Sequence, residues 1–254
     1  MDSDTRSGGS RSKTLDVISV LDEGGATGVT EIAEQLSIAK STAHYHLDTL
    51  REKGFVVRDG TRYKLSMEFL KFGFRVRQRI PLFEAAKTEI DKLGRKTGEL
   101  VILSTEQRGL GVYLYKAGGS EALDVDAPIG RTATLHNRAL GKAMMTHFSE
   151  TKVEQILDDH GLPQTTDQTI TSRDELYEEL DRIREEGAAF NREEHIEGIN
   201  GVGVPILSAG GAVLGAVSIA GPTSRMRGST FTENYPYLLS KARNVIELEL
   251  GHNS

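Results

Sequence analysis

Residues 36–65, LSIAKSTAHYHLDTLREKGFVVRDGTRYKL, decide the fold of the N-terminal third of the chain. Apolar side chains at Ala43, Leu47 and Leu50 repeat at helical spacing, and Gly54 ends this helix. Two β-prone runs follow, residues 55–57 and 62–65, and the Asp-Gly pair between them is a strong hairpin signal. The segment therefore predicts a helix followed by a two-stranded wing.

Two shorter helices are expected before this segment. The first has apolar residues at Leu15, Ile18 and Leu21, with Ser12 or Thr14 as the candidate cap and a Gly-Gly stop. The second has Val29, Ile32, Ala33 and Leu36 at spacings of three and four, with Thr30 as its candidate cap. A short helix, a tight turn and a second amphipathic helix form a helix-turn-helix. We therefore expect a winged helix-turn-helix over residues 12–65, after a disordered tail over residues 1–11.

The third helix and the wing carry the chemistry of a DNA-binding surface. The N-terminal end of a recognition helix meets base edges, and the side of this helix opposite its apolar stripe is expected to present Lys40, Ser41, Thr42, Tyr45 and His46. On the wing, Arg58 and Arg62 suit phosphate or minor-groove contacts. Taken singly, Ser41 and Thr42 can equally be helix-starting residues. His44 and His46 can equally be surface or core-edge histidines, and their spacing is poor for a metal pair.

Composition and charge agree with a two-domain globular protein. The 254 residues carry a net charge of −6, but residues 1–80 hold 13 Lys and Arg against 11 Asp and Glu, whereas the remainder holds 18 against 26. The slightly basic part is the predicted DNA-binding domain. The chain has no cysteine, which excludes disulfides and thiol catalysis. It has no apolar run of membrane-spanning length and no secretory signal, so we expect a cytoplasmic protein.

After the wing, the pattern changes to mixed helix and strand. Residues 66–79, SMEFLKFGFRVRQR, form an expected linker helix, and Pro81 opens another helix. Antiparallel hairpins are expected at 100–119 and 201–222, amphipathic helices at 149–161 and 172–187, and a closing helix at 232–251. This order favours an α+β fold with a sensor-like sheet domain over residues 80–254.

Four motifs resemble the isocitrate-lyase-regulator (IclR) family of transcription factors. They are STAHYHLDTLREKGFV at 41–56, LHNRALGKAMM at 135–145, GAAFNREEHIEGINGVGVPI at 187–206 and GAVSIAGP at 215–222. They occur in the family's order and spacing, and the likeness covers residues 12–250. The resemblance implies a GAF-like effector-binding domain, a homodimer or homotetramer, and control of nearby metabolic operons. We expect a repressor, with an activator as the alternative.

The resemblance also implies which residues line the effector pocket. Transferred position by position, it points to Ala139, Leu140, Asn191, Arg192, Glu193, Gly201, Ser218 and Ala220. Better-known members often have an acidic residue in place of Arg192 and a cysteine in place of Gly201. These two departures predict a different and more anionic effector. The alternative is that Arg192 and Glu193, with Glu194 and His195, form a solvated turn, and that Gly201 is a packing glycine.

Other classes of function find less support. His136, Ser218 and Glu193 or Glu194 can be assembled into a hydrolase-like set, but no G-x-S-x-G motif surrounds any serine. We therefore expect no catalytic residues, no metal and no cofactor. The expected partners are double-stranded operator DNA and a small organic molecule. The alternative is a metabolite-binding or scaffold protein that uses its winged helix for protein contacts.

Overall fold

A computed structural model describes residues 9–119, 121–123 and 127–252 of the chain. The chain divides into two compact units, one ending at Val76 and the other beginning at Arg77. The tail expected over residues 1–11 lies mostly outside the described residues, and the first helix begins at Gly9 rather than at Ser12 or Thr14.

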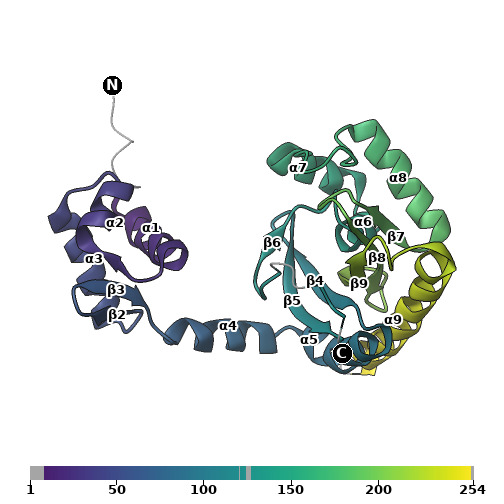
Figure 1. Cartoon of the computed structure of the whole chain (residues 1–254), viewed down its shortest axis with the longest axis horizontal. Coiled ribbons are helices and arrows are strands. Elements are labelled where there is room, and N and C mark those ends of the chain that lie inside the picture. Colours follow the sequence, from purple (N-terminus) through teal and green to yellow (C-terminus); the bar gives the residue numbers. More distant parts are fainter. Residues whose placement is uncertain (1–8, 120, 124–126, 253–254) are drawn as a thin grey trace. The chain divides into compact units, whose positions relative to one another are not determined.

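The N-terminal unit is a winged helix-turn-helix, which confirms the predicted fold (Figure 1). Its elements in chain order are α1 (Gly9–Gly24), β1 (Thr27–Gly28), α2 (Val29–Gln35), α3 (Lys40–Glu52), β2 (Val56–Asp59) and β3 (Arg62–Leu65). The short β1 was not predicted, and it pairs with β3 to make a sheet of order β1-β3-β2. Val17, Leu21, Ile32 and Leu47 are buried together in the core of this unit. The expected apolar face of α1 is partly wrong, because Leu15 is 65% exposed and Val17 is buried instead.

The helix α4 (Glu68–Gln78) follows the wing and contains no buried residue. Phe55 lies against Phe69 and Phe72, which attaches the start of α4 to the wing. Leu70 and Val76 are 69% and 63% exposed, so most of the apolar surface of this helix faces solvent.

A six-stranded antiparallel sheet forms the centre of the C-terminal unit, in the order β6-β5-β4-β9-β8-β7. The strands are β4 (Leu100–Gln107), β5 (Leu110–Gly118), β6 (Thr132–Ala133), β7 (Ala189–Arg192), β8 (Ile199–Leu207) and β9 (Val213–Pro222). Every pairing is antiparallel, in agreement with the α+β prediction.

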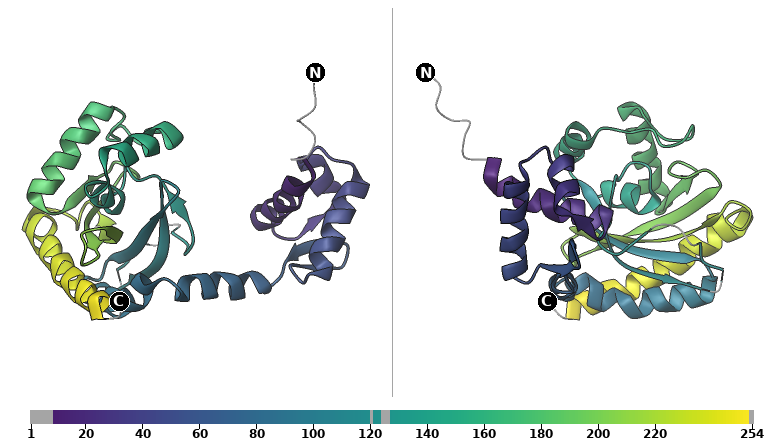
Figure 2. Two further views of the ribbon diagram at one scale, coloured as in Figure 1. Left: turned by 180° about the vertical axis from the view of Figure 1, so that it is seen from behind. Right: turned by 60° about the vertical axis from the view of Figure 1, so that its left-hand side comes forward.

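Helices cover both faces of this sheet (Figures 1 and 2). On one face lie α5 (Pro81–Thr97) and α9 (Tyr235–His252), with the short π-helix η1 (Thr230–Asn234) leading into α9. The other face carries α6 (Ala139–Met145), with α7 (Glu150–His160) and α8 (Arg173–Glu186) beyond it. No helix among the described residues is long and apolar enough to cross a bilayer.

Strand alternation separates two apolar clusters, one on each face of the sheet. Val217 and Ile219 of β9 pack with α5 and α9, whereas Ala216 packs with α6, α7 and α8. The helix α6 approaches β8 closely because residue 203 is glycine. A Cβ at Gly203 would lie 3.0 Å from the backbone of Ala139 and Leu140. This approach sets the N-terminal end of α6 against the sheet.

Candidate functional site

The exposed face of α3 carries most of the predicted DNA-binding residues. Lys40 and Ser41 are exposed at the first turn of the helix, and Thr42 is half-buried beside them. Tyr45 is 67% exposed one turn later. These side chains leave a cation, two hydroxyls and a phenol at the end of the helix that reads base edges.

The expectation that His46 belongs to this face is wrong. Its side chain is 3% exposed, and its Nδ1 lies 2.8 Å from Thr14 Oγ1 of α1. Positions 43, 46, 47 and 50 form one continuous stripe on a helix, so His46 falls among Ala43, Leu47 and Leu50. The neighbouring His44 is the exposed histidine of α3.

The two predicted arginines of the wing differ in their hydrogen bonds and ion pairs. Arg62 Nε donates to the Ala26 carbonyl at 2.7 Å, and its terminal nitrogen forms an ion pair with Glu31 Oε2 at 2.7 Å. Arg58 lies in the β2–β3 hairpin, where its Nε donates to the Gly60 carbonyl. No ion pair involves Arg58 among the described residues, so it is the cation more available to phosphate.

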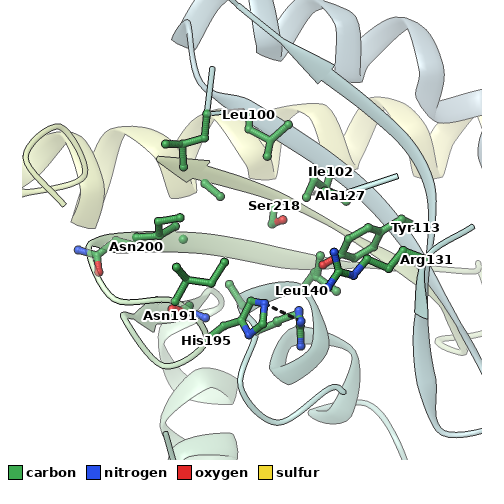
Figure 3. A pocket seen from close by; sticks show the side chains of 17 residues that line it. Leu100, Ile102, Tyr113, Ala127, Arg131, Leu140, Asn191, His195, Asn200 and Ser218 are labelled. Atoms are coloured by element: carbon green, nitrogen blue, oxygen red, sulfur yellow. Dashed lines mark hydrogen bonds between the residues drawn. The ribbon is translucent and has the colours of Figure 1, made fainter. Parts of the chain in front are cut away.

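An apolar cavity of the C-terminal unit lies between the sheet and the start of α6 (Figure 3). Its volume is about 90 Å³. A single water needs roughly 10–15 Å³ on the same measure, so this space suits a small organic molecule. Leu100 and Ile102 supply apolar walls from β4, and Tyr113 supplies another from β5. Such an apolar cavity with few polar groups is typical of a ligand-binding site.

Six of the eight residues transferred from the family line this cavity: Ala139, Leu140, Asn191, Gly201, Ser218 and Ala220. The Ser218 hydroxyl faces the space and makes no hydrogen bond to any described residue. Asn191 is instead held by the protein, since its Nδ2 donates to the Asn137 carbonyl at 2.7 Å.

Arg192 and Glu193 do not line this cavity, so the prediction that they belong to the effector pocket is wrong. Residues next to each other on a strand face opposite sides of a sheet, so Asn191 and Arg192 diverge. The Arg192 guanidinium lies over the rings of Phe190 and Phe231, on the face covered by α9. Glu193 has a φ of 61°, and its carboxylate accepts a hydrogen bond from the backbone N–H of Gly198.

The cationic groups that do line the cavity are Arg131 and Arg138, which the sequence reasoning missed. Arg138 directly precedes α6, is 9% exposed, and places its terminal nitrogen 2.7 Å from His195 Nε2 (dashed line in Figure 3). Burial lowers the pKa of His195 to about 4, and the nearby Arg138 charge contributes to the same shift. Burial also lowers the pKa of Arg138, while the Tyr113 hydroxyl acts in the opposite direction.

A buried ion cluster fixes the loop that carries His195. Lys142 of α6 is fully buried, and its Nζ lies 2.8 Å from Glu179 Oε1 and 2.7 Å from Glu194 Oε1. Burial lowers the pKa of Lys142, and Glu194 opposes that shift. The backbone N–H of Glu194 also donates to Asn191 Oδ1 at 3.1 Å. One wall of the cavity is thereby tied to α6 and α8.

A signal for Arg138 was present in the sequence. It stands immediately before the predicted pocket residues 139 and 140, in the motif LHNRALGKAMM. Strand alternation in AFNR also assigns residues 191 and 192 to opposite faces. No pattern in the sequence indicates that His195 meets Arg138, because 57 positions separate them.

Comparisons with known proteins cover both units. Residues 10–60 match the IclR helix-turn-helix domain, and residues 74–247 match the C-terminal domain of bacterial IclR transcriptional regulators. The chain is similar to the HTH-type transcriptional regulator KdgR of Escherichia coli K12. The two are 29% identical over 95% of this chain and 92% of KdgR.

Solved structures share the whole fold. The IclR protein of Thermotoga maritima superposes with a TM-score of 0.81 at 30% identity, covering 95% of this chain and 98% of its own. An IclR homologue from Microbacterium hydrocarbonoxydans, solved in complex with 4-hydroxybenzoate, has a TM-score of 0.83 at 20% identity. It covers 96% of this chain and 100% of its own, and this second likeness concerns the fold alone.

Proposed function

The chain belongs to the IclR family of bacterial transcriptional regulators, and on this premise we propose that it controls a metabolic operon in response to a small molecule. It is a DNA-binding regulator and not an enzyme. The observation that carries the proposal is the pairing, in one chain, of an exposed recognition helix with a ligand-sized cavity. A regulator of operon DNA acts where the chromosome lies, so we place it in the cytoplasm.

In the proposed complex, α3 enters the major groove with Lys40, Ser41, Thr42 and Tyr45 toward the bases. Arg58 on the wing contacts phosphate. An effector in the C-terminal cavity changes operator affinity to the extent that it binds the DNA-bound and free forms unequally.

The protein is proposed to bind as a homodimer, or as a homotetramer built from two such dimers. A two-fold dimer places two recognition helices on a pseudo-palindromic operator. The exposed Leu70 and Phe74, 69% and 52% accessible, lie one turn apart on α4 and suit burial against the same helix of a second copy. Leu70→Asp is expected to shift the sedimentation coefficient toward the monomer and to weaken operator binding.

DNA binding is tested by fluorescence anisotropy with fragments from upstream of the gene. Tyr45→Ala or Lys40→Ala should weaken binding to the preferred fragment by about 1–3 kcal/mol if the side chain reads a base. Lys92→Ala is the matched control, because it removes the same charge from a lysine of α5 in the other unit. If no upstream fragment is preferred over random DNA, the winged helix serves protein contacts instead.

Effector binding is tested by thermal shift with a panel of small metabolites, because a ligand that binds only the folded state raises the Tm. The complex of the Microbacterium homologue makes 4-hydroxybenzoate a reasonable member of that panel. A ligand that raises the Tm and also changes the anisotropy titration supports the proposed regulation.

A further inference from the structure

A histidine occupies the apolar core of the N-terminal unit, at a position where leucine would pack without polar atoms. His46 is 3% exposed and shares the buried stripe of α3 with Ala43, Leu47 and Leu50. Burying a polar ring costs free energy unless its nitrogens form hydrogen bonds. A buried polar side chain that is bonded in this way holds one orientation, which a leucine would not.

The bond that holds His46 joins two helices. Thr14 belongs to α1, which packs against α3, and its Oγ1 lies 2.8 Å from His46 Nδ1. A hydroxyl group both donates and accepts, so Thr14 can bond to this nitrogen in either neutral tautomer of the ring. The contact therefore fixes the plane of the His46 ring relative to α1.

The other contact of the His46 ring is with Tyr45. The two ring centroids lie 5.4 Å apart with an angle of 74° between the planes, which is the favourable edge-to-face arrangement. Consecutive side chains on a helix normally point apart. This contact therefore depends on how the His46 ring is turned, and the bond to Thr14 determines that orientation.

Tyr45 itself is 67% exposed, so the protein around it restrains it little. Among the described residues, no other ring contacts Tyr45, and no group forms a hydrogen bond with its hydroxyl. An exposed side chain loses conformational entropy when a partner orders it, and a side chain that is already held loses less. Restraint of the Tyr45 ring before binding should therefore increase its affinity for whatever it contacts.

We propose that His46 is a positioning residue for DNA recognition: held by Thr14 of α1, its ring fixes the Tyr45 ring on the face of α3 that meets DNA. The His46 ring is buried, so it acts through Tyr45 and does not itself touch DNA. This assignment rests on the proposed function, because it takes Tyr45 as a DNA contact.

A double-mutant cycle on the full chain tests whether His46 acts through Tyr45. Fluorescence anisotropy with the preferred upstream fragment compares the parent, His46→Leu, Tyr45→Ala and the double variant. His46→Leu keeps the core apolar, and it should weaken binding by about two- to tenfold, the range that an aromatic pair contributes. In the Tyr45→Ala background the same change should alter the Kd by less than about twofold, because the ring that His46 positions is absent. A role limited to holding α3 on α1 would weaken both backgrounds equally.

Thr14→Val gives a second test that leaves the His46 ring in place. It removes the hydroxyl at nearly constant shape, and it should weaken DNA binding in the same Tyr45-dependent way, even if His46→Leu does not fold. His160→Leu is the matched control for His46→Leu, because it makes the same exchange in α7 of the C-terminal unit. It should bind DNA like the parent.

The orientation of Tyr45 is measured without DNA by fluorine NMR of the full chain labelled with 3-fluorotyrosine. The chain has 7 tyrosines, and the Tyr45 signal is identified by its loss in Tyr45→Ala. Thr14→Val should shift this signal, because the freed His46 ring no longer holds Tyr45. Ser19→Ala should leave it unchanged, since the Ser19 hydroxyl bonds only to the Leu15 carbonyl of its own helix.

Three results would overturn the assignment: parent-like DNA binding by His46→Leu, an equal loss in both Tyr45 backgrounds, or a Tyr45 signal that Thr14→Val leaves in place. The proposed function fails separately. If no upstream fragment is preferred over random DNA while Thr14→Val still shifts the Tyr45 signal, the protein is not the proposed operon regulator, and the link from Thr14 through His46 to Tyr45 stands.

Discussion

Replacing Lys142 by methionine tests the buried ion cluster beneath the cavity. The Lys142 ammonium is fully buried between Glu179 and Glu194, at 2.8 and 2.7 Å, and both carboxylates are nearly buried. Arg182 also contacts Glu179, so the loss of Lys142 leaves Glu194 as the uncompensated charge. Removing one partner of a buried ion pair costs about 3–5 kcal/mol. For a unit of this size, that loss corresponds to a drop in Tm of about 6–20 °C.

The measurement is thermal unfolding of the full chain by circular dichroism. Lys152→Met is the control, because Lys152 is 41% exposed and its ion pair with Glu106 should contribute less to stability than the fully buried pairs of Lys142. Adding Glu194→Gln to Lys142→Met should recover part of the loss, since it removes the stranded charge. If Lys142→Met unfolds within about 1 kcal/mol of Lys152→Met, the cluster does not hold the loop as described.

Three further outcomes are expected. Ser218→Leu should fill the cavity and abolish ligand binding by calorimetry, while the anisotropy titration with DNA stays unchanged; unaltered ligand affinity would contradict the position given to Ser218. Burial holds the pKa of His136 and of His195 at about 4, so between pH 6.5 and 4 the unfolded chain binds more protons than the folded chain. The Tm should therefore fall as pH is lowered from 7 to 4.5, and a flat profile would refute those shifts. Arg58→Ala should flatten the salt dependence of DNA binding more than Arg62→Ala, because Arg62 already pairs with Glu31; the reverse order would make Arg62 the phosphate contact.

Local patterns predicted the elements of the fold well. The Asp-Gly turn between two β-prone runs identified the wing. Strand alternation in AVSIAG likewise agrees with the structure, which places Val217 and Ile219 on one face and Ser218 on the other. These features depend on neighbours within a few residues, and such neighbours are visible in a sequence.

The errors at the candidate sites have two different causes. His46 and Arg192 were misplaced although helix and strand periodicity already pointed away from the DNA face and from the cavity. The Arg138–His195 contact could not be predicted for another reason. It depends on how the β7–β8 loop folds back over the start of α6, and on Gly203, which allows that helix to approach the sheet. Long-range contacts of this kind leave no periodic trace.

The two faces of the sheet in the C-terminal unit have different roles: one packs the apolar core and the other lines the cavity. Val217 and Ile219 pack on the side of α5 and α9, and Ser218 and Ala220 face the cavity on the other side. Side chains on opposite faces of a strand contact different neighbours. Ligand preference can therefore drift, or be redesigned for a biosensor, by exchanging residues on one face while the apolar layer on the other keeps the fold. In β9, the residues that face the cavity can vary while the residues that face the core stay apolar.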